Sequence, residues 1–189
     1  MNKYEKLQDY LKKVEYLNYT VSMLRWEMDT IAPKKSFDYL IDVSTKYETD
    51  TFKLTTSDEY ISLIEDLLNS DEISSLEEMQ ISYINTLKKG YYELKNVPSD
   101  FYEEYSSLRN KSLNAWGEAK EKNDYQIFKP YLKAIIQNTK QLYRYMHPDT
   151  EDLYDCMLND YEEGMKSEQI DKLFESLKQQ IIPIIKFIR

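Results

Sequence analysis

The sequence of 189 residues has little of what builds turns and little of what performs metal or nucleophilic chemistry. It has three glycines and five prolines, well below the average usage of about 7% and 5%. With so few turn formers, most of the chain must lie in long elements. The only histidine is His147 and the only cysteine is Cys156. A zinc hydrolase site takes about three protein ligands, usually with histidines, and a disulfide needs two cysteines. A Ser-His-Asp triad would have to use His147.

Positive charge is also scarce, because 25 lysines and arginines face 34 aspartates and glutamates, for a net charge of -9. Proteins that bind nucleic acid usually carry a basic patch or stripe. Here the longest basic groups are pairs of lysines at 12–13, 34–35 and 88–89, each among acidic residues. We interpret these pairs as solvated helix faces, and we predict no nucleic-acid partner.

Long apolar runs are missing as well. The charged N-terminal stretch 1–13 has no apolar segment of the kind found in a signal peptide. No stretch approaches the roughly 18 apolar residues that indicate a membrane span. A lone cysteine fits a reducing compartment, and the acidic neighbours of Cys156 favour a packing role over a nucleophilic one. We therefore expect a cytoplasmic protein with no membrane segment.

What the sequence does contain is helical periodicity, and it predicts an all-α fold of about seven or eight helices in an irregular bundle, with no significant sheet. We expect one helical domain over residues 1–189. The helices are expected over 4–32, from 37, 56–68, 74–94, 99–122, 125–146, 153–158 and from 167. Proline at Pro33 should end the first helix.

Several of these helix ends are predicted from capping patterns. Capping boxes at Thr56–Glu59 and Ser74–Glu77 should open the third and fourth helices. Ser99 or Asp100 should cap the fifth helix. The pair Asn123-Asp124 should separate the fifth helix from the sixth, and residues 147–149 should form a turn. Gly164 should be a left-handed cap after the short helix, and Ser167 should cap the last one.

The segment Ile181–Arg189 is apolar nearly all round its helix and contains Pro183, which should kink it. Two interpretations stay open. The segment packs into the core of its own domain, or its partner surface lies in the rest of a longer chain or in a second subunit, which would make a homodimer.

Three stretches of the sequence resemble motifs of one protein family. Residues 24–33 are similar to L-x-W-D-x-x-T-x-M-P. Residues 115–132 are similar to A-W-x-x-A-[KR]-x-x-N-D-[FY]-x-x-F-x-P-x-L. Residues 154–165 are similar to Y-D-x-L-L-x-D-Y-E-P-G-M, and a segment like L-V-P-L-L follows at 181–185. By these motifs the chain resembles the thermostable (Taq-type) metallocarboxypeptidases. It departs from the motifs at Glu27, Ala32 and Glu163, where the family usually has Asp, Met and Pro.

The resemblance implies the N-terminal region of a longer enzyme that releases single residues from peptide C-termini with a divalent metal, which we expect to be zinc. The family's H-E-x-x-H helix and further ligands would lie in the C-terminal catalytic part, beyond residue 189. We therefore expect no catalytic, metal or cofactor residue in this chain, and no activity from it alone. By resemblance, it would form one wall or lid of the cleft that takes the peptide substrate.

Few individual residues are candidates for a functional role. Asp160, Tyr161 and Glu162 are the residues that we most expect to face the cleft or the catalytic part. The surrounding acidic cluster lacks the spacing of an EF-hand. We expect Trp26 and Trp116 to be core residues, and His147 to be a solvated turn residue. The alternative function is a stand-alone, non-catalytic helical interaction protein with the same fold, which would use its 18 tyrosines and its acidic surface to bind a partner.

Overall fold

The computed structural model describes residues 1–188, and within this range the chain is helical, with no β-strand. This confirms the prediction of an all-α fold with seven or eight helices and no sheet. The elements are α1 (Lys3–Thr30), η1 (Lys34–Ser36), α2 (Phe37–Thr55), α3 (Asp58–Leu68), η2 (Asp71–Ser75), α4 (Glu78–Leu94), α5 (Ser99–Lys122), α6 (Tyr125–Met146), α7 (Leu153–Asn159) and α8 (Ser167–Ile188). Over the same range, no helix is both long enough and apolar enough to cross a lipid bilayer.

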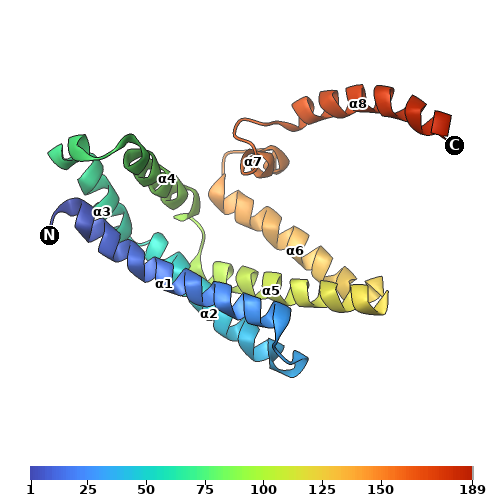
Figure 1. Ribbon diagram of the computed structural model, residues 1–189, viewed down its shortest axis with the longest axis horizontal. Helices are drawn as coiled ribbons and strands as arrows, with labels where there is room; N and C mark the ends of the chain where they lie inside the picture. Colours follow the sequence, from blue (N-terminus) through green and yellow to red (C-terminus); the bar gives the residue numbers. More distant parts are fainter. Residues whose placement is uncertain (189) are drawn as a thin grey trace. The chain divides into compact units, whose positions relative to one another are not determined.

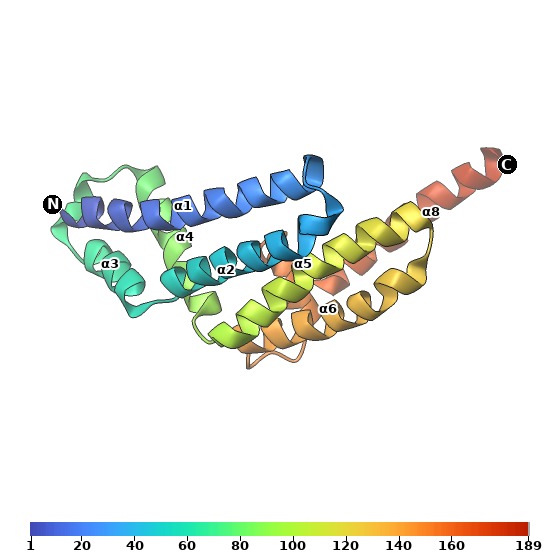
Figure 2. The ribbon, with the colours of Figure 1, turned by 90° about the horizontal axis from the view of Figure 1, so that it is seen from below.

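The chain divides into two compact units, Met1–Met146 with α1 to α6 and His147–Arg189 with α7 and α8. In the first unit, α2 packs against both α1 and α5, and α5 packs along α6 (Figures 1 and 2). Helix α3 contacts both α1 and α4. The first unit therefore has α2 at its centre, in contact with α1, α3 and α5.

The largest apolar cluster of the first unit joins α1, α3 and α4. Its buried side chains are Leu7, Tyr10, Val14, Tyr60, Ile64, Leu67 and Ile84. The Tyr10 hydroxyl lies 2.9 Å from the carbonyl oxygen of Leu54 and donates to it, so this buried polar group is satisfied at the end of α2. The cluster holds the N-terminal half of α1 against the α3–α4 pair.

A second cluster joins α2, α5 and α6. Phe52 stacks on Tyr102 with ring centroids 4.1 Å apart. Val97 and Leu142 complete the buried set, and Phe101 meets Tyr145 edge-on at 5.1 Å. Burial raises the pKa of the Tyr102 phenol above its usual value of 10.0.

Two of the helix ends follow from single residues. Helix α1 ends at Thr30, as predicted from Pro33. Helix α5 ends where Asn123 adopts a left-handed conformation, with φ of 51°. The side chain of Asp124 then accepts from the amide of Gln126 at 2.9 Å, in the first turn of α6. The predicted stop and cap at Asn123-Asp124 is therefore confirmed.

The two predicted capping boxes are wrong. Thr56 donates its hydroxyl back to the carbonyl of Phe52 at 2.7 Å, and Ser57 caps α3 instead. Ser74 donates to the carbonyl of Asp71 within η2, and Glu77 caps α4. An N-cap residue has an extended backbone, which Ser57 and Glu77 have, with ψ of 155° and 152°. Thr56 is instead the C-cap of α2, and Ser74 lies inside η2.

The N-cap of α5 also differs from the prediction. It is Pro98, and Ser99 is the first helical residue. Proline suits the start of a helix because its fixed φ matches the helix and no amide donor is lost there.

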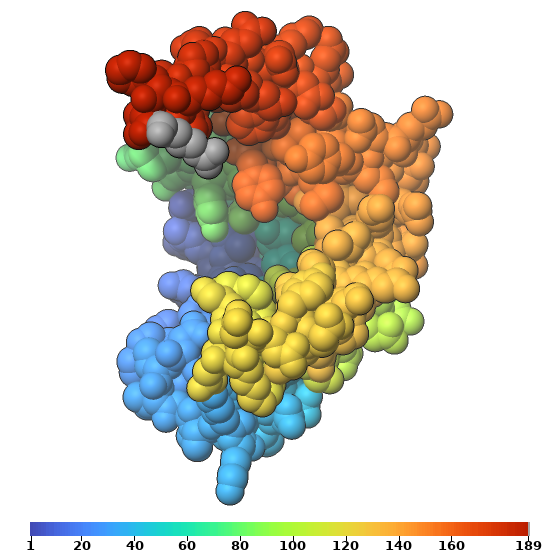
Figure 3. Space-filling model, turned by 90° about the vertical axis from the view of Figure 1, so that its right-hand side faces the viewer, coloured from blue at the N-terminus to red at the C-terminus, as the bar shows by residue number. Residues whose placement is uncertain are grey.

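Figure 3 looks onto the end of the first unit where α5 (yellow) passes into α6, beside the turn between α1 and α2 (blue). Lys34 forms an ion pair with Glu121 here and joins the α1–α2 turn to the end of α5. This pair lowers the pKa of the Glu121 carboxyl below its usual value.

In the second unit, Asp152 caps α7 by accepting from the amides of Tyr154 and Asp155. Helix α7 ends at Asn159, and the chain turns through residues 160–166 into α8. Gly164 has a φ of 84°, so its predicted left-handed conformation is confirmed, but it lies in this turn and not at the helix end. Ser167 is the first residue of α8 and not its cap.

Helix α8 has no buried residue, so the interpretation that it packs into a core is not supported. Its apolar residues are exposed throughout Ile181–Ile188. Pro183 lies inside the continuous helix.

Candidate functional site

The turn between α7 and α8 contains the three residues predicted to face a cleft. Asp160 is the C-cap of α7, and the amides of Tyr161 and Glu162 both donate to the carbonyl of Leu158 at 3.0 Å. The side chain of Tyr161 is 89% exposed, and Glu162 is exposed as well. The structure therefore places the three residues together on a solvent-exposed turn, and what they face stays a prediction.

The carboxylate of Asp155 fixes the far end of this turn. Its Oδ1 accepts from the backbone amide of Ser167 at 2.7 Å, and this bond lowers the pKa of Asp155 below its usual value of 3.8. The amide of Gly164 donates to Oδ1 of Asn159 at 2.9 Å. Much of the third sequence motif thus has a local structural role, because Asp155 and Gly164 set the path of the chain from α7 to α8.

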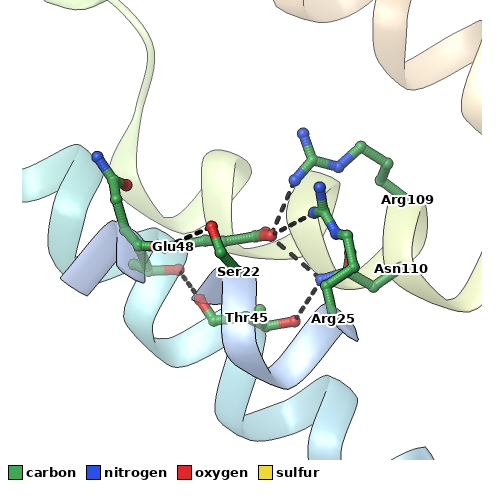
Figure 4. Close-up of polar contacts among 8 residues, drawn as sticks. Ser22, Arg25, Thr45, Glu48, Arg109 and Asn110 are labelled. Carbon is green, nitrogen blue, oxygen red and sulfur yellow. Dashed lines mark hydrogen bonds and ion pairs between the residues drawn. The ribbon is translucent and has the colours of Figure 1, made fainter. Parts of the chain in front are cut away.

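A second polar cluster lies inside the first unit, between α1, α2 and α5 (Figure 4). At its centre is Glu48 of α2, whose side chain is only 7% exposed. Arg25 of α1 and Arg109 of α5 both reach the Oε1 atom of Glu48 through Nη2, at 3.3 Å and 2.9 Å. Asn110 donates from Nδ2 to Oε2 of Glu48 at 3.4 Å. One buried carboxylate thus links three helices.

Sequence reasoning missed this cluster. The available signal is that Arg25 and Arg109 are two of only four arginines in the chain, and arginine is favoured over lysine where a carboxylate is bound away from water. Arg25 also lies inside the first motif, next to Trp26, which is the more conspicuous residue there. Glu48 gave no signal, because a single glutamate in a charged helix resembles any exposed one.

The two tryptophans are not core residues, contrary to the prediction. Both Trp26 and Trp116 are exposed on their helices. Trp116 is covered on one ring face by Lys120, whose Nζ lies 4.7 Å from the ring centroid. The buried positions near Trp116 are taken by smaller residues, Ala115 and Ala119.

A metal site does not fit the side chains of this chain. Among residues 1–188, no three His, Cys, Asp or Glu side chains are grouped so that they could hold a metal ion. His147, the only histidine, lies in the turn that follows α6, as predicted.

Comparison with known proteins supports the family resemblance. Residues 6–189 match the family described as Carboxypeptidase Taq (M32) metallopeptidase. Carboxypeptidase 1 of Bacillus subtilis strain 168 is 34% identical over 182 residues, which cover 94% of this chain and 35% of that protein. Thermostable carboxypeptidase 1 of Pyrococcus furiosus is 25% identical, over 92% of this chain and 34% of that protein.

Comparison with solved structures also finds carboxypeptidases. A crystal structure of a protein named BsuCP matches with a TM-score of 0.90 and 32% identity, covering 98% of this chain and 37% of that one. The structure of Pyrococcus furiosus carboxypeptidase described as Apo-Mg matches in fold, with a TM-score of 0.75, 23% identity and coverage of 100% of this chain and 37% of that one. The chain thus spans about a third of the length of these relatives, and it belongs to the carboxypeptidase Taq (M32) metallopeptidase family.

Proposed function

We propose that this chain is the N-terminal part of a metal-dependent carboxypeptidase that hydrolyses single residues from peptide C-termini. The match of residues 6–189 to the family carries this proposal, together with relatives that are named carboxypeptidases. These relatives are about three times as long as the matched region, since it covers 34–35% of them. The catalytic part of such a protein would follow the residues described here.

The role assigned to this part is to form one wall or lid of the peptide cleft. The turn at 160–162 would face the cleft or the catalytic part. In support, the turn has a defined path, held by the hydrogen bonds of Asp155 and Gly164, and it exposes Tyr161. An exposed turn suits contact with a substrate or with a second domain.

The exposed face of α8 supports a covering partner. Burying a large apolar side chain stabilises a protein by about 1.5–3 kcal/mol, and the segment Ile181–Ile188 has several such side chains in solvent. The rest of the longer chain is the partner that we assign to it, and a second copy is the other arrangement.

The metal is assigned to the rest of the protein, and zinc is the ion that we expect. The side chains of residues 1–188 do not fit a metal site, as described above. We further propose a cytoplasmic location, which rests on the single cysteine.

The test begins with the nucleotide sequence beyond the codon for Arg189. An open frame with an H-E-x-x-H motif supports the proposal, and a stop codon supports the rival, a stand-alone helical interaction protein. The longer protein should release C-terminal residues from a peptide in a metal-dependent reaction that a chelator abolishes. The chain of 189 residues should release none with added zinc, and release by this chain alone would contradict the proposal.

The turn is tested in the longer protein by replacing Asp160, Tyr161 and Glu162 with alanine, one at a time. A cleft role predicts a change in KM or kcat at unchanged melting temperature. Tyr154, which is also an exposed tyrosine of the second unit, provides the matched control. Unchanged kinetics together with unchanged stability in all three variants would remove the turn from the cleft.

A further inference from the structure

The cluster around Glu48 holds more positive than negative charge. Two guanidinium groups, from Arg25 and Arg109, converge on one carboxylate oxygen, and Asn110 is neutral. Two positive charges and one negative charge give these four side chains a net charge of +1, in a chain whose net charge is -9.

The same two side chains also have unused hydrogen-bond donors. A guanidinium group has five N–H donors in a planar fork. Arg25 and Arg109 each form one ion pair, through Nη2 in both cases. Within the described residues, the Nε of Arg109 has no hydrogen-bond partner, but it is buried, so a ligand from solvent would bind to the remaining Nη donors. The two side chains are 49% and 38% exposed, so a ligand can reach them from solvent.

Exposed apolar side chains lie on the same face of α5 as Arg109. Leu113 and Trp116 follow Arg109 by four and seven residues on α5, which places all three on one face of the helix. Both side chains are exposed. The surface thus combines a positive group with an apolar flank, and this combination suits an anion carried on an apolar body.

We propose that Arg25 and Arg109 form a binding site for a carboxylate, with the apolar part of the ligand against Leu113 and Trp116. A carboxylate matches the single excess charge, and its two oxygens match the fork of a guanidinium. Glu48 already shows that both arginines accept this ligand class. The ligand comes from one of two sources, a small carboxylate in solution or an acidic side chain of the longer protein. The second source rests on the proposed function, and the first does not.

Arginine Nε–H resonances of the chain of 189 residues provide the test, with acetate as the probe and chloride at matched ionic strength as the reference. We expect saturable shifts at Arg25 and Arg109 with a dissociation constant on the order of 10 mM, as a few charge-assisted hydrogen bonds allow. Arg144, exposed on α6, is the internal control and should not shift. Equal, non-saturable shifts at all three arginines would overturn the site.

Benzoate tests the apolar flank, because it has the same carboxylate on a larger apolar body. It should bind more tightly than acetate, and Trp116→Ala should remove this difference while it leaves acetate binding unchanged. Benzoate binding no tighter than acetate would overturn the assignment of Trp116 to the site.

Substitutions test the fork and the charge separately. Lysine keeps the charge but loses the planar fork, so R25K should weaken acetate binding by about tenfold, and R144K should have no effect. R109K should weaken acetate binding as R25K does. R25K disturbs the fold less, because Arg25 makes the longer contact with Glu48, at 3.3 Å. E48Q removes the internal anion and should tighten acetate binding several-fold. Unchanged or weaker binding in a folded E48Q protein would overturn the charge argument.

The longer protein distinguishes the two sources. If one of its own acidic side chains occupies the site, acetate will shift the two arginines in the chain of 189 residues and not in the longer protein. If the ligand comes from solution, acetate will shift them in both. Either result supports the site. Failure of acetate to bind to the chain of 189 residues overturns the site and leaves the proposed carboxypeptidase function untouched.

Discussion

Replacing Ile84 by alanine should weaken the attachment of α4 to the rest of the first unit. Ile84 is the single buried residue of α4 and is 1% exposed. It packs in the cluster of α1, α3 and α4. Truncation of a buried isoleucine to alanine costs about 2–5 kcal/mol, according to how far the site can relax. The neighbours of Ile84 on α4 are only partly buried and can shift, so we expect a cost of about 2–3 kcal/mol.

Urea unfolding followed by circular dichroism measures this cost. For a slope of about 1–3 kcal/mol per molar urea, the midpoint should fall by roughly 0.7–3 M with the slope nearly unchanged. Met79, which is 81% exposed on the same helix, is the matched control. Met79→Ala should stay within about 0.5 kcal/mol of the native protein.

Amide hydrogen exchange then locates the loss. Protection should fall over Glu78–Leu94 more than over α5 or α6, because Ile84 is the buried link between α4 and the cluster. An Ile84→Ala protein that loses less than about 1 kcal/mol, or as little as Met79→Ala, would refute the reasoning that one side chain docks this helix.

The remaining predictions concern a phenol, a carboxylate and two glycines. Burial raises the pKa of Tyr60 from 10.0 to about 12. The stability that the neutral phenol contributes should be complete below pH 10 and lost as pH rises through about 12. Spectrophotometric titration at 295 nm should show a phenol that titrates near pH 12 and that Tyr60→Phe removes. The hydrogen bond from the Ser167 amide lowers the pKa of Asp155. The stability that this bond contributes should be present above pH 3.8 and lost as pH falls through the lower pKa of the folded protein. The Ser167 amide resonance should follow this titration, and Asp155→Asn should abolish the titration. Gly164→Ala should destabilise the protein by about 1–2 kcal/mol, because φ is 84° and alanine is strained there. An added Cβ would meet nothing within 4 Å, so the backbone strain is the whole effect. Gly90→Ala, in the interior of α4 with equally open space, should stabilise by about 0.5–1 kcal/mol, and thermal unfolding of both variants gives the comparison.

Most of the helices could be predicted because their signals are local. Apolar spacing marks the length of a helix, and Pro33 or Asn123 marks its end. The caps of α3 and α4 could not be predicted correctly, because the cap is the residue at which the backbone becomes extended. The preceding turns continue through Thr56 and Ser74, and the extended residues are Ser57 and Glu77.

The polar cluster could not be predicted because it depends on packing between distant segments. Arg25 and Glu48 are 23 residues apart, and Arg109 comes from a third helix. Their sequence neighbours give no sign that these charges converge. The burial of the tryptophans was mispredicted for a related reason, since a large aromatic residue in an amphipathic helix does not reveal which face a neighbouring helix will cover.

The distribution of buried residues along α1 has a consequence for its motion. Its buried residues, Leu7, Tyr10 and Val14, all lie in the first half of the helix. The second half has no buried residue, although α1 packs against α2 and the ion pair between Arg25 and Glu48 joins the two helices. Because partly exposed contacts contribute less than a buried apolar cluster, we expect the amides of the second half to exchange before those of the first half. Helix α1 would then open from its C-terminal end while its N-terminal half stays packed.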